Sequence, residues 1–130
     1  DDADTKGCTP LIYACHRGLV PVIEMLLRGG AGTAAALTGS GYRAIHACAM
    51  NGDPLAMQLM VSYEADLEAR DFEDGLTSLH VTAQEGHWAA AEVLVQAGVK
   101  LESLAFNGAT ALFMASSFGH PGVVGVLLRA

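Results

Sequence analysis

The sequence has 130 residues, of which 52% are hydrophobic and 16% are charged, and its formal net charge is −7 at pH 7. This length and apolar content suit a single domain with a continuous core. The 14 acidic side chains outnumber the 7 basic ones, which argues against a nucleic-acid-binding protein, because that class needs a basic surface to contact phosphates. The same excess suits a protein partner that carries a basic patch.

Glycines divide the chain into four segments of similar pattern. Gly7, Gly41, Gly75 and Gly108 lie 34, 34 and 33 residues apart. Eleven residues after each of them comes a second glycine: Gly18, Gly52, Gly86 and Gly119. Apolar pairs follow at 19 and 20 residues: Leu26-Leu27, Met60-Val61, Leu94-Val95 and Leu127-Leu128. A period of this length indicates an all-α solenoid of stacked units, with approximate bounds 7–40, 41–74, 75–107 and 108–130.

Each segment predicts two short helices joined by a turn. In the third segment Thr77 can cap the first helix, Gly86 ends it, and a second helix is expected over 88–96. The prolines support this register, because a proline inside a helix costs about 3 kcal/mol whereas one in the first turn is tolerated. All four lie at expected helix starts: Pro10, Pro21, Pro54 and Pro121.

In chain order, Thr9 starts the first helix, the second begins near Pro21, and the uncharged stretch 31–40 connects the first two units. The next helix starts at Arg43, which has no hydroxyl for capping. We therefore expect it to be the least stable helix start, by about 1 kcal/mol relative to a threonine.

The segment 64–74 is the main charge cluster. It contains six acidic residues against Arg70, and the register places it in the loop between the second and third units. One hypothesis is a solvated loop that aids solubility. The other is an acidic projection that steers a basic partner. The spacing differs from that of a calcium-binding loop.

The last unit is free of charge from Ser103 to Leu128, so a membrane span has to be considered. Asn107, the serine pair 116–117 and the segment 119–122 interrupt this run where the repeat requires turns, and we do not expect a span. Neither end of the chain has the polar face of a capping repeat. We therefore expect a fragment of a longer array, or ends that other proteins cover.

The motifs resemble the ankyrin repeats, whose units read G-x-T-P-L-H-x-A, then G-H, then L-L-x-x-G-A-D. Residues 7–14 read GCTPLIYA and 75–80 read GLTSLH, while Gly86-His87 and Gly119-His120 supply the G-H step. The resemblance covers nearly the whole chain, although Arg43-Ala44 replaces Thr-Pro in the second unit. It implies two antiparallel helices and a projecting loop in each unit.

The histidines recur at shared positions, His46 with His80 and His87 with His120. The resemblance implies hydrogen bonds between neighbouring units for the histidine of T-P-L-H, and a zinc site would need ligands that converge on one point. His16 is at a position that the family leaves variable. We expect no metal.

The three cysteines form an odd set inside the repeat pattern, which indicates reduced thiols and an intracellular, reducing compartment. We expect Cys15 and Cys48 in the core and Cys8 nearer the surface. No charged-then-apolar leader opens the chain, so no signal peptide is predicted. Cys15-His16 or His46 with Cys48 would be a conceivable nucleophile pair, but no orienting group accompanies either. Motifs for phosphate, dinucleotide or acyl chemistry are also absent. We expect neither an enzyme nor a cofactor.

The resemblance implies protein binding through the loop tips and the exposed side of the first helices. The expected partner-binding residues are Arg17, Tyr42, Met50, Asn51, Glu73, Asp74, Leu76, Glu85, Phe106 and Phe118. The large apolar members are candidate anchors, or else they pack along the groove or under neighbouring loops. Trp88 is expected in the core or packed on the convex face. The leading hypothesis is an interaction or scaffolding module. The alternatives are a regulatory domain of a larger enzyme and a structural subunit inside a multi-protein complex.

Overall fold

The computed structural model describes residues 9–34 and 40–130. These residues form eight helices in four successive pairs: α1 (Pro10–Arg17) with α2 (Val20–Arg28), α3 (Ala44–Asn51) with α4 (Pro54–Ser62), α5 (Ser78–Glu85) with α6 (Trp88–Gln96), and α7 (Ala111–Ser117) with α8 (Pro121–Arg129). The predictions for Cys8 and for the middle of the 31–40 connector lie outside the described residues.

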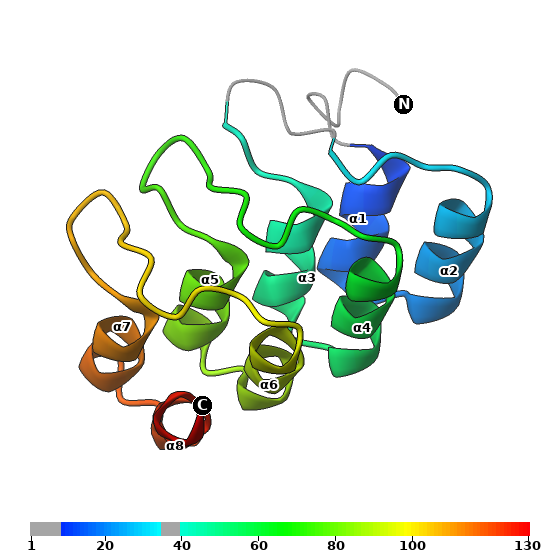
Figure 1. Cartoon of the computed structure of the whole chain (residues 1–130). Coiled ribbons are helices and arrows are strands. Elements are labelled where there is room, and N and C mark those ends of the chain that lie inside the picture. The colour runs from blue at the N-terminus through cyan, green and yellow to red at the C-terminus, as the bar shows by residue number, and fades with distance from the viewer. Residues whose placement is uncertain (1–8, 35–39) are drawn as a thin grey trace.

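The helices lie in two rows, and the loops project from one side (Figure 1). Helices α1, α3, α5 and α7 pack one against the next, α2, α4, α6 and α8 form the second row, and each pair also packs internally. This arrangement confirms the all-α solenoid. In the third pair the expected helix after Thr77 and the expected helix over 88–96 are both present.

Hydroxyl caps begin three of the four helices in the first row. The Oγ1 atoms of Thr9, Thr77 and Thr110 each accept the N–H of the residue three positions later. Arg43 precedes α3 without a side-chain cap, and its own N–H donates to Nδ1 of His46 at 3.0 Å. Helices α2, α6 and α8 also begin without a side-chain cap. The start of α3 therefore resembles three of the four second-row helices, whereas α4 is capped by Asp53.

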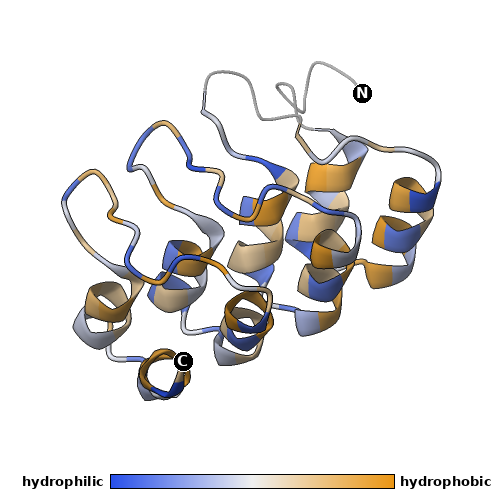
Figure 2. Cartoon of the chain, in the orientation of Figure 1, coloured by the Kyte–Doolittle hydropathy of each residue, from blue (hydrophilic) through white to orange (hydrophobic). Residues whose placement is uncertain are grey.

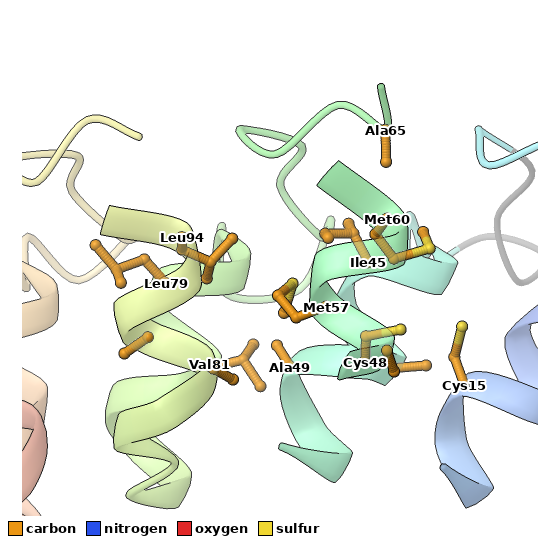
Figure 3. Packing of buried hydrophobic residues seen from close by; sticks show 14 of the residues in the cluster. Cys15, Ile45, Cys48, Ala49, Met57, Met60, Ala65, Leu79, Val81 and Leu94 are labelled. Atoms are coloured by element: carbon orange, nitrogen blue, oxygen red, sulfur yellow. The ribbon is translucent and has the colours of Figure 1, made fainter. Parts of the chain in front are cut away.

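The buried apolar side chains of all four helix pairs form one continuous cluster. Figure 3 shows part of it, from Cys15 to Leu94. Met57 and Met60 of α4 are fully buried, and burying a methionine side chain contributes about 1.5–3 kcal/mol. Figure 3 shows Met57 between its own helix pair and the pair that carries Val81 and Leu94. Each pair therefore depends on its neighbours for part of its apolar burial.

The two described cysteines lie in this core, as predicted. Cys15 of α1 and Cys48 of α3 are free thiols with no exposed surface. A hydrogen bond with the Cys15 thiol, together with burial, raises the pKa of the Cys48 thiol. The protonated thiol is a poor nucleophile, so this pair acts as small packing residues between the first two units.

Backbone hydrogen bonds join successive loop tips. The N–H of Phe72 donates to the carbonyl of Ser40 at 2.7 Å, and the N–H of Phe106 donates to the carbonyl of Asp74 at 2.8 Å. Each tip is thereby held against the tip of the preceding unit. Figure 2 shows hydrophilic and hydrophobic stretches alternating along these loops, so the loop row presents apolar groups as well as charges.

The uncharged stretch of the last unit folds into a loop and two short helices. Helix α7 has seven residues and α8 has nine. Within 9–34 and 40–130, none of the helices has the length and apolarity that crossing a bilayer requires. Of the two alternatives for Trp88, the structure excludes the core, because the residue is 54% exposed. It starts α6 and lies against Gly122 of α8, which is the outer-row packing that was the other alternative.

Candidate partner-binding surface

One row of histidines connects neighbouring units, as expected. His80 Nδ1 accepts the N–H of Thr77 at 3.1 Å, so Nε2 carries the proton and donates to the carbonyl of Ala109 at 3.1 Å. His46 Nε2 lies 3.1 Å from the carbonyls of Ala69 and Leu76. Desolvation by burial lowers the pKa of both imidazoles. Both rings therefore stay neutral and serve as structural links.

A second row connects the ends of the first-row helices. His87 Nε2 donates to the carbonyl of Met50, and His120 Nε2 to the carbonyl of Gln84, both at 2.9 Å. In the second unit Asp53 stands at the position equivalent to His87 and His120. The link between the first two units is made instead by Asn51, whose side-chain amide donates to the carbonyl of His16 at 3.3 Å. In the described part of the chain, no three histidine, cysteine or acidic side chains converge to hold a metal ion.

Part of the acidic segment stabilises the loop itself. Asp71 Oδ1 accepts the N–H groups of Asp74, Gly75 and Leu76 at 3.0, 2.9 and 3.3 Å. Glu68 Oε2 accepts the N–H of Lys100 in the next loop at 2.8 Å. These two carboxylates hold backbone in place.

Other acids of the same segment face solvent at its tip. Glu73 and Asp74 are exposed and adjacent, one residue before the buried Gly75. Arg70 donates to the carbonyls of Gly75 and Leu104, so it ties two loops together. The segment thus combines the two hypotheses, since some carboxylates build the loop and others lie exposed on it.

The candidate residues of the first two units form a polar and aromatic cluster. The Tyr42 hydroxyl lies 3.2 Å from His16 Nε2, and its ring stacks on His46 with centroids 5.7 Å apart. Arg17 is exposed and donates to the Tyr13 hydroxyl at 2.7 Å. For Tyr42 the structure favours the packing alternative, because the ring contributes to the junction between units. Met50 is likewise half-buried against the core.

A pocket of about 530 Å³ opens between α5, α7 and the loop that precedes α7. It lies at the junction of the third and fourth units, where the loop tips meet the first-row helices. Its walls are mostly apolar and aromatic, with one acidic residue. The lining residues are Asp74, Leu76, Gln84, Ala105, Phe106, Asn107, Ala109, Phe113, Met114, Ser117 and Phe118.

The structure brings together four of the ten expected residues in this pocket: Asp74, Leu76, Phe106 and Phe118. Two more are sequence neighbours of the lining, since Glu73 precedes Asp74 and Glu85 follows Gln84. The remaining four lie where the first two units meet or near the ends of α1 and α3: Arg17, Tyr42, Met50 and Asn51.

Sequence reasoning missed Phe113, which is 62% exposed on the pocket wall. It stands five residues after Gly108, the position that His46 and His80 occupy in their units. Because those histidines are buried, the register predicts a buried residue there. The sequence signal that could have identified Phe113 is the replacement of a hydrogen-bonding histidine by an aromatic residue at this position.

Phe106 has a structural role as well as an exposed face. Its ring covers Gly75, where an added Cβ would lie 2.4 Å from Phe106 Cδ1. Phe72 covers Gly41 of the preceding unit in the same way, at 2.7 Å. Phe118 covers no glycine of a neighbouring unit and is 54% exposed. Of Phe106 and Phe118, Phe118 is therefore the better candidate for an anchor that contacts a partner without a structural role.

Comparison with known proteins gives consistent matches along the chain. The family model described as ankyrin repeats (3 copies) matches residues 1–71 and 45–130. Human ankyrin repeat and SOCS box protein 3 is 30% identical over 114 residues, which are 85% of this chain and 21% of that protein. The human transient receptor potential cation channel subfamily A member 1 is 33% identical over 129 residues, covering 98% of this chain and 11% of that protein.

A fungal relative extends the comparison. The ankyrin repeat protein nuc-2 of Neurospora crassa is 32% identical over 121 residues, which are 92% of this chain and 11% of that protein. The chain therefore spans about a fifth or less of the length of these relatives.

Proposed function

Because the chain belongs to the ankyrin-repeat family, whose members generally mediate protein–protein interactions, we propose that this array is a non-catalytic module for binding a protein partner. The proposed contact surface is the side where the loop tips meet the first-row helices. One observation carries the proposal: exposed aromatic side chains line a pocket on that side, at positions where the fold does not need them buried. Aromatic residues in such pockets are frequent interface anchors.

The chemistry of the buried polar groups supports a non-catalytic role. The imidazoles of His46, His80, His87 and His120 are occupied in links between units. A general base needs a ring nitrogen that reaches a substrate, and these nitrogens face backbone groups instead. The Cys48 thiol is buried and protonated. These four imidazoles and the Cys48 thiol are thus part of the scaffold.

The charge of the loop row supports a partner with a basic patch. Glu73 and Asp74 are exposed at a loop tip next to the pocket, and Glu85 is exposed at the end of α5. Exposed carboxylates on one face raise the association rate of a cationic partner, and salt weakens this effect. This matches the overall charge of −7.

The cysteines support a proposed reducing, intracellular compartment. Cys15 and Cys48 pack against each other as thiols, and their removal from solvent leaves them as core residues. Paired cysteines in oxidising compartments are usually disulfides. The proposal is tested by treating cells that express the protein with a thiol-trapping reagent at lysis and analysing Cys15 and Cys48 by mass spectrometry. Both residues recovered as labelled thiols support the proposal, and a Cys15–Cys48 disulfide overturns it.

The function is tested by affinity capture from native extract, followed by quantitative mass spectrometry at low and moderate salt. The bait is compared with the double variant Tyr42→Ala/Phe118→Ala, and with Leu55→Ala, a matched loss of an exposed apolar side chain on the outer row. We expect at least one protein whose recovery falls about tenfold with the double variant, equivalent to about 1.4 kcal/mol, and stays unchanged with Leu55→Ala. Thermal melting of each variant checks that the array is folded. Equal capture by all three baits would contradict the proposal.

A further inference from the structure

The pocket between the third and fourth units has the size and lining of a site for one bulky apolar side chain. Its volume of about 530 Å³ falls in the usual range for binding pockets, about 300–1,000 Å³. The walls include Leu76, Phe113, Met114 and Phe118. A tryptophan or phenylalanine buries about 150–250 Å² when enclosed in this way. The lining therefore favours an aromatic or a large aliphatic anchor.

Two lining residues of the fourth unit differ in chemistry from their equivalents in the second and third units. Phe113 stands where His46 and His80 donate hydrogen bonds to the next unit, and a phenyl ring has no such donor. Phe118 stands where the preceding units carry Asn51 and Glu85. The aromatic wall is therefore a property of the fourth unit, and it is not required by the repeat.

Acidic side chains outnumber basic ones around the pocket. The basic neighbour, Arg70, donates to the carbonyls of Gly75 and Leu104, which are adjacent to lining residues. Asp74 is the charged residue of the lining, and no lysine, arginine or histidine is among the lining residues. Glu73 and Glu85, each next to a lining residue in sequence, are exposed. A cationic side chain next to the anchor gains attraction to these carboxylates, whereas an acidic one meets repulsion.

We propose that this pocket binds a segment of a partner protein in which one large apolar side chain is flanked by lysine or arginine. The inference rests on the proposed function and adds the chemistry and the place of the contact. The anchor inserts against Phe113 and Phe118, and the flanking cation lies near Asp74 and Glu73. The aromatic wall sets affinity, and the acidic rim selects against acidic segments.

The test uses capped pentapeptides and the backbone amide signals of the isotope-labelled chain in NMR. The probe is GKWKG, compared with GEWEG, which reverses the flanking charge, and GKAKG, which removes the anchor. Protein variants are Phe118→Ala and Asp74→Asn. Their matched controls are Leu55→Ala on the outer row and Glu102→Gln, an exposed acid of the loop after α6 that does not line the pocket.

We expect GKWKG to shift the amides of Gln84, Asn107 and Ser117, with GEWEG binding about threefold more weakly and GKAKG at least tenfold more weakly. Phe118→Ala lowers the affinity for GKWKG about tenfold. Asp74→Asn reduces the preference for GKWKG over GEWEG, as does added salt. Both controls bind like the unchanged chain.

Several results would overturn the inference. These are equal binding of GKWKG and GEWEG, no shifts up to millimolar peptide, or shifts centred on His16 and Tyr42. Pocket shifts that depend on protein concentration without peptide would identify a second copy as the occupant. Loss of GKWKG binding in a longer natural chain would show that a following unit occupies the pocket. Capture of a protein partner that depends on Tyr42 but not on Phe118 would leave the proposed function standing and overturn this inference alone.

Discussion

The Nε2 atom of His87 lies 2.9 Å from the carbonyl oxygen of Met50, which is 37 residues earlier in the chain. To reach it, the imidazole lies directly over Gly52, where an added Cβ would be 2.3 Å from His87 Cγ. Gly52 also ends α3 with φ of +86°, a conformation that favours glycine. One residue thus serves both the helix end and the contact between units.

Replacing Gly52 by alanine separates these two effects when Gly98→Ala is the control. Gly98 has φ of +90° but open space around its Cα, so its replacement costs about 1–2 kcal/mol for the left-handed backbone alone. Gly52→Ala also displaces the His87 ring, and we expect about 1 kcal/mol more from the lost hydrogen bond. Urea unfolding at neutral pH measures both variants. Equal losses would show that the ring moves away without cost.

Removing the Asp71 carboxylate tests whether some acids of the segment 64–74 stabilise the loop while others lie exposed on it. Its Oδ1 accepts three backbone N–H groups at the start of the third unit, and hydrogen bonds to a charged group contribute about 1.5–3 kcal/mol. We expect Asp71→Ala to lower the free energy of unfolding by about 2 kcal/mol and to speed hydrogen exchange at Gly75 and Leu76. Asp71→Asn keeps a side-chain oxygen that accepts hydrogen bonds, so we expect it to lower the free energy of unfolding less than Asp71→Ala does.

Glu73→Ala is the matched control for the acidic segment, because the side chain is exposed two residues away. It leaves the stability within about 0.5 kcal/mol, while its charge contributes to partner steering. A large loss of stability from Glu73→Ala would contradict the assignment of this carboxylate to the surface.

The repeat register was predictable because it depends on local chemistry that recurs. Glycines at helix ends, prolines in first turns and threonine caps each specify a backbone conformation, and α5 and α6 lie where Thr77 and Gly86 place them. The structural role of His80 was predictable for the same reason, because its position is shared with His46.

The pocket was not predictable from the same signals. Whether Phe113 is buried or exposed depends on what covers α7, and that is a question of tertiary packing. The double role of Phe106 depends on a contact with Gly75, 31 residues earlier, and the sequence pattern does not report the direction of a loop side chain. For Trp88 the sequence left two alternatives, because a large apolar residue at a helix start is compatible with either face.

Acidification below about pH 6.5 is expected to destabilise the array. Burial lowers the pKa of His46 and His80 below 6.5 in the folded state, so the unfolded chain binds protons first as the pH falls. Their contribution to stability is complete above pH 6.5 and is lost progressively as the pH falls from there towards the folded pKa. The reference pKa values of carboxyl groups lie below this window.

Urea unfolding of a His80→Asn variant at several pH values checks the acid effect. Asparagine does not titrate and keeps an N–H donor for the Ala109 carbonyl, so we expect lower stability at pH 7.5 and a shallower fall towards pH 5. The control is His16→Asn, which replaces an exposed histidine of α1, and the change in slope is compared between the two variants. An unchanged slope in His80→Asn would assign the acid effect to other groups.

The start of α3 provides a prediction in the stabilising direction. In α5 the Thr77 hydroxyl accepts the N–H of His80, and the equivalent N–H of His46 has no side-chain acceptor because Arg43 cannot supply one. We expect Arg43→Thr to be about 1 kcal/mol more stable than Arg43→Ala. This difference raises the midpoint of thermal unfolding by a few degrees.

Comparison with Arg43→Ala removes the effect of losing the arginine. The Arg43 guanidinium is 4.0 Å from the Asp66 carboxylate, and most of the Asp66 side chain is exposed, so this pair contributes less than about 1 kcal/mol. Both variants lose it, and only threonine adds the cap. If the two variants melt together, the hydrogen bond from the Arg43 N–H to His46 Nδ1 already fixes the helix start. In that case an imidazole three residues into the helix substitutes for a capping hydroxyl.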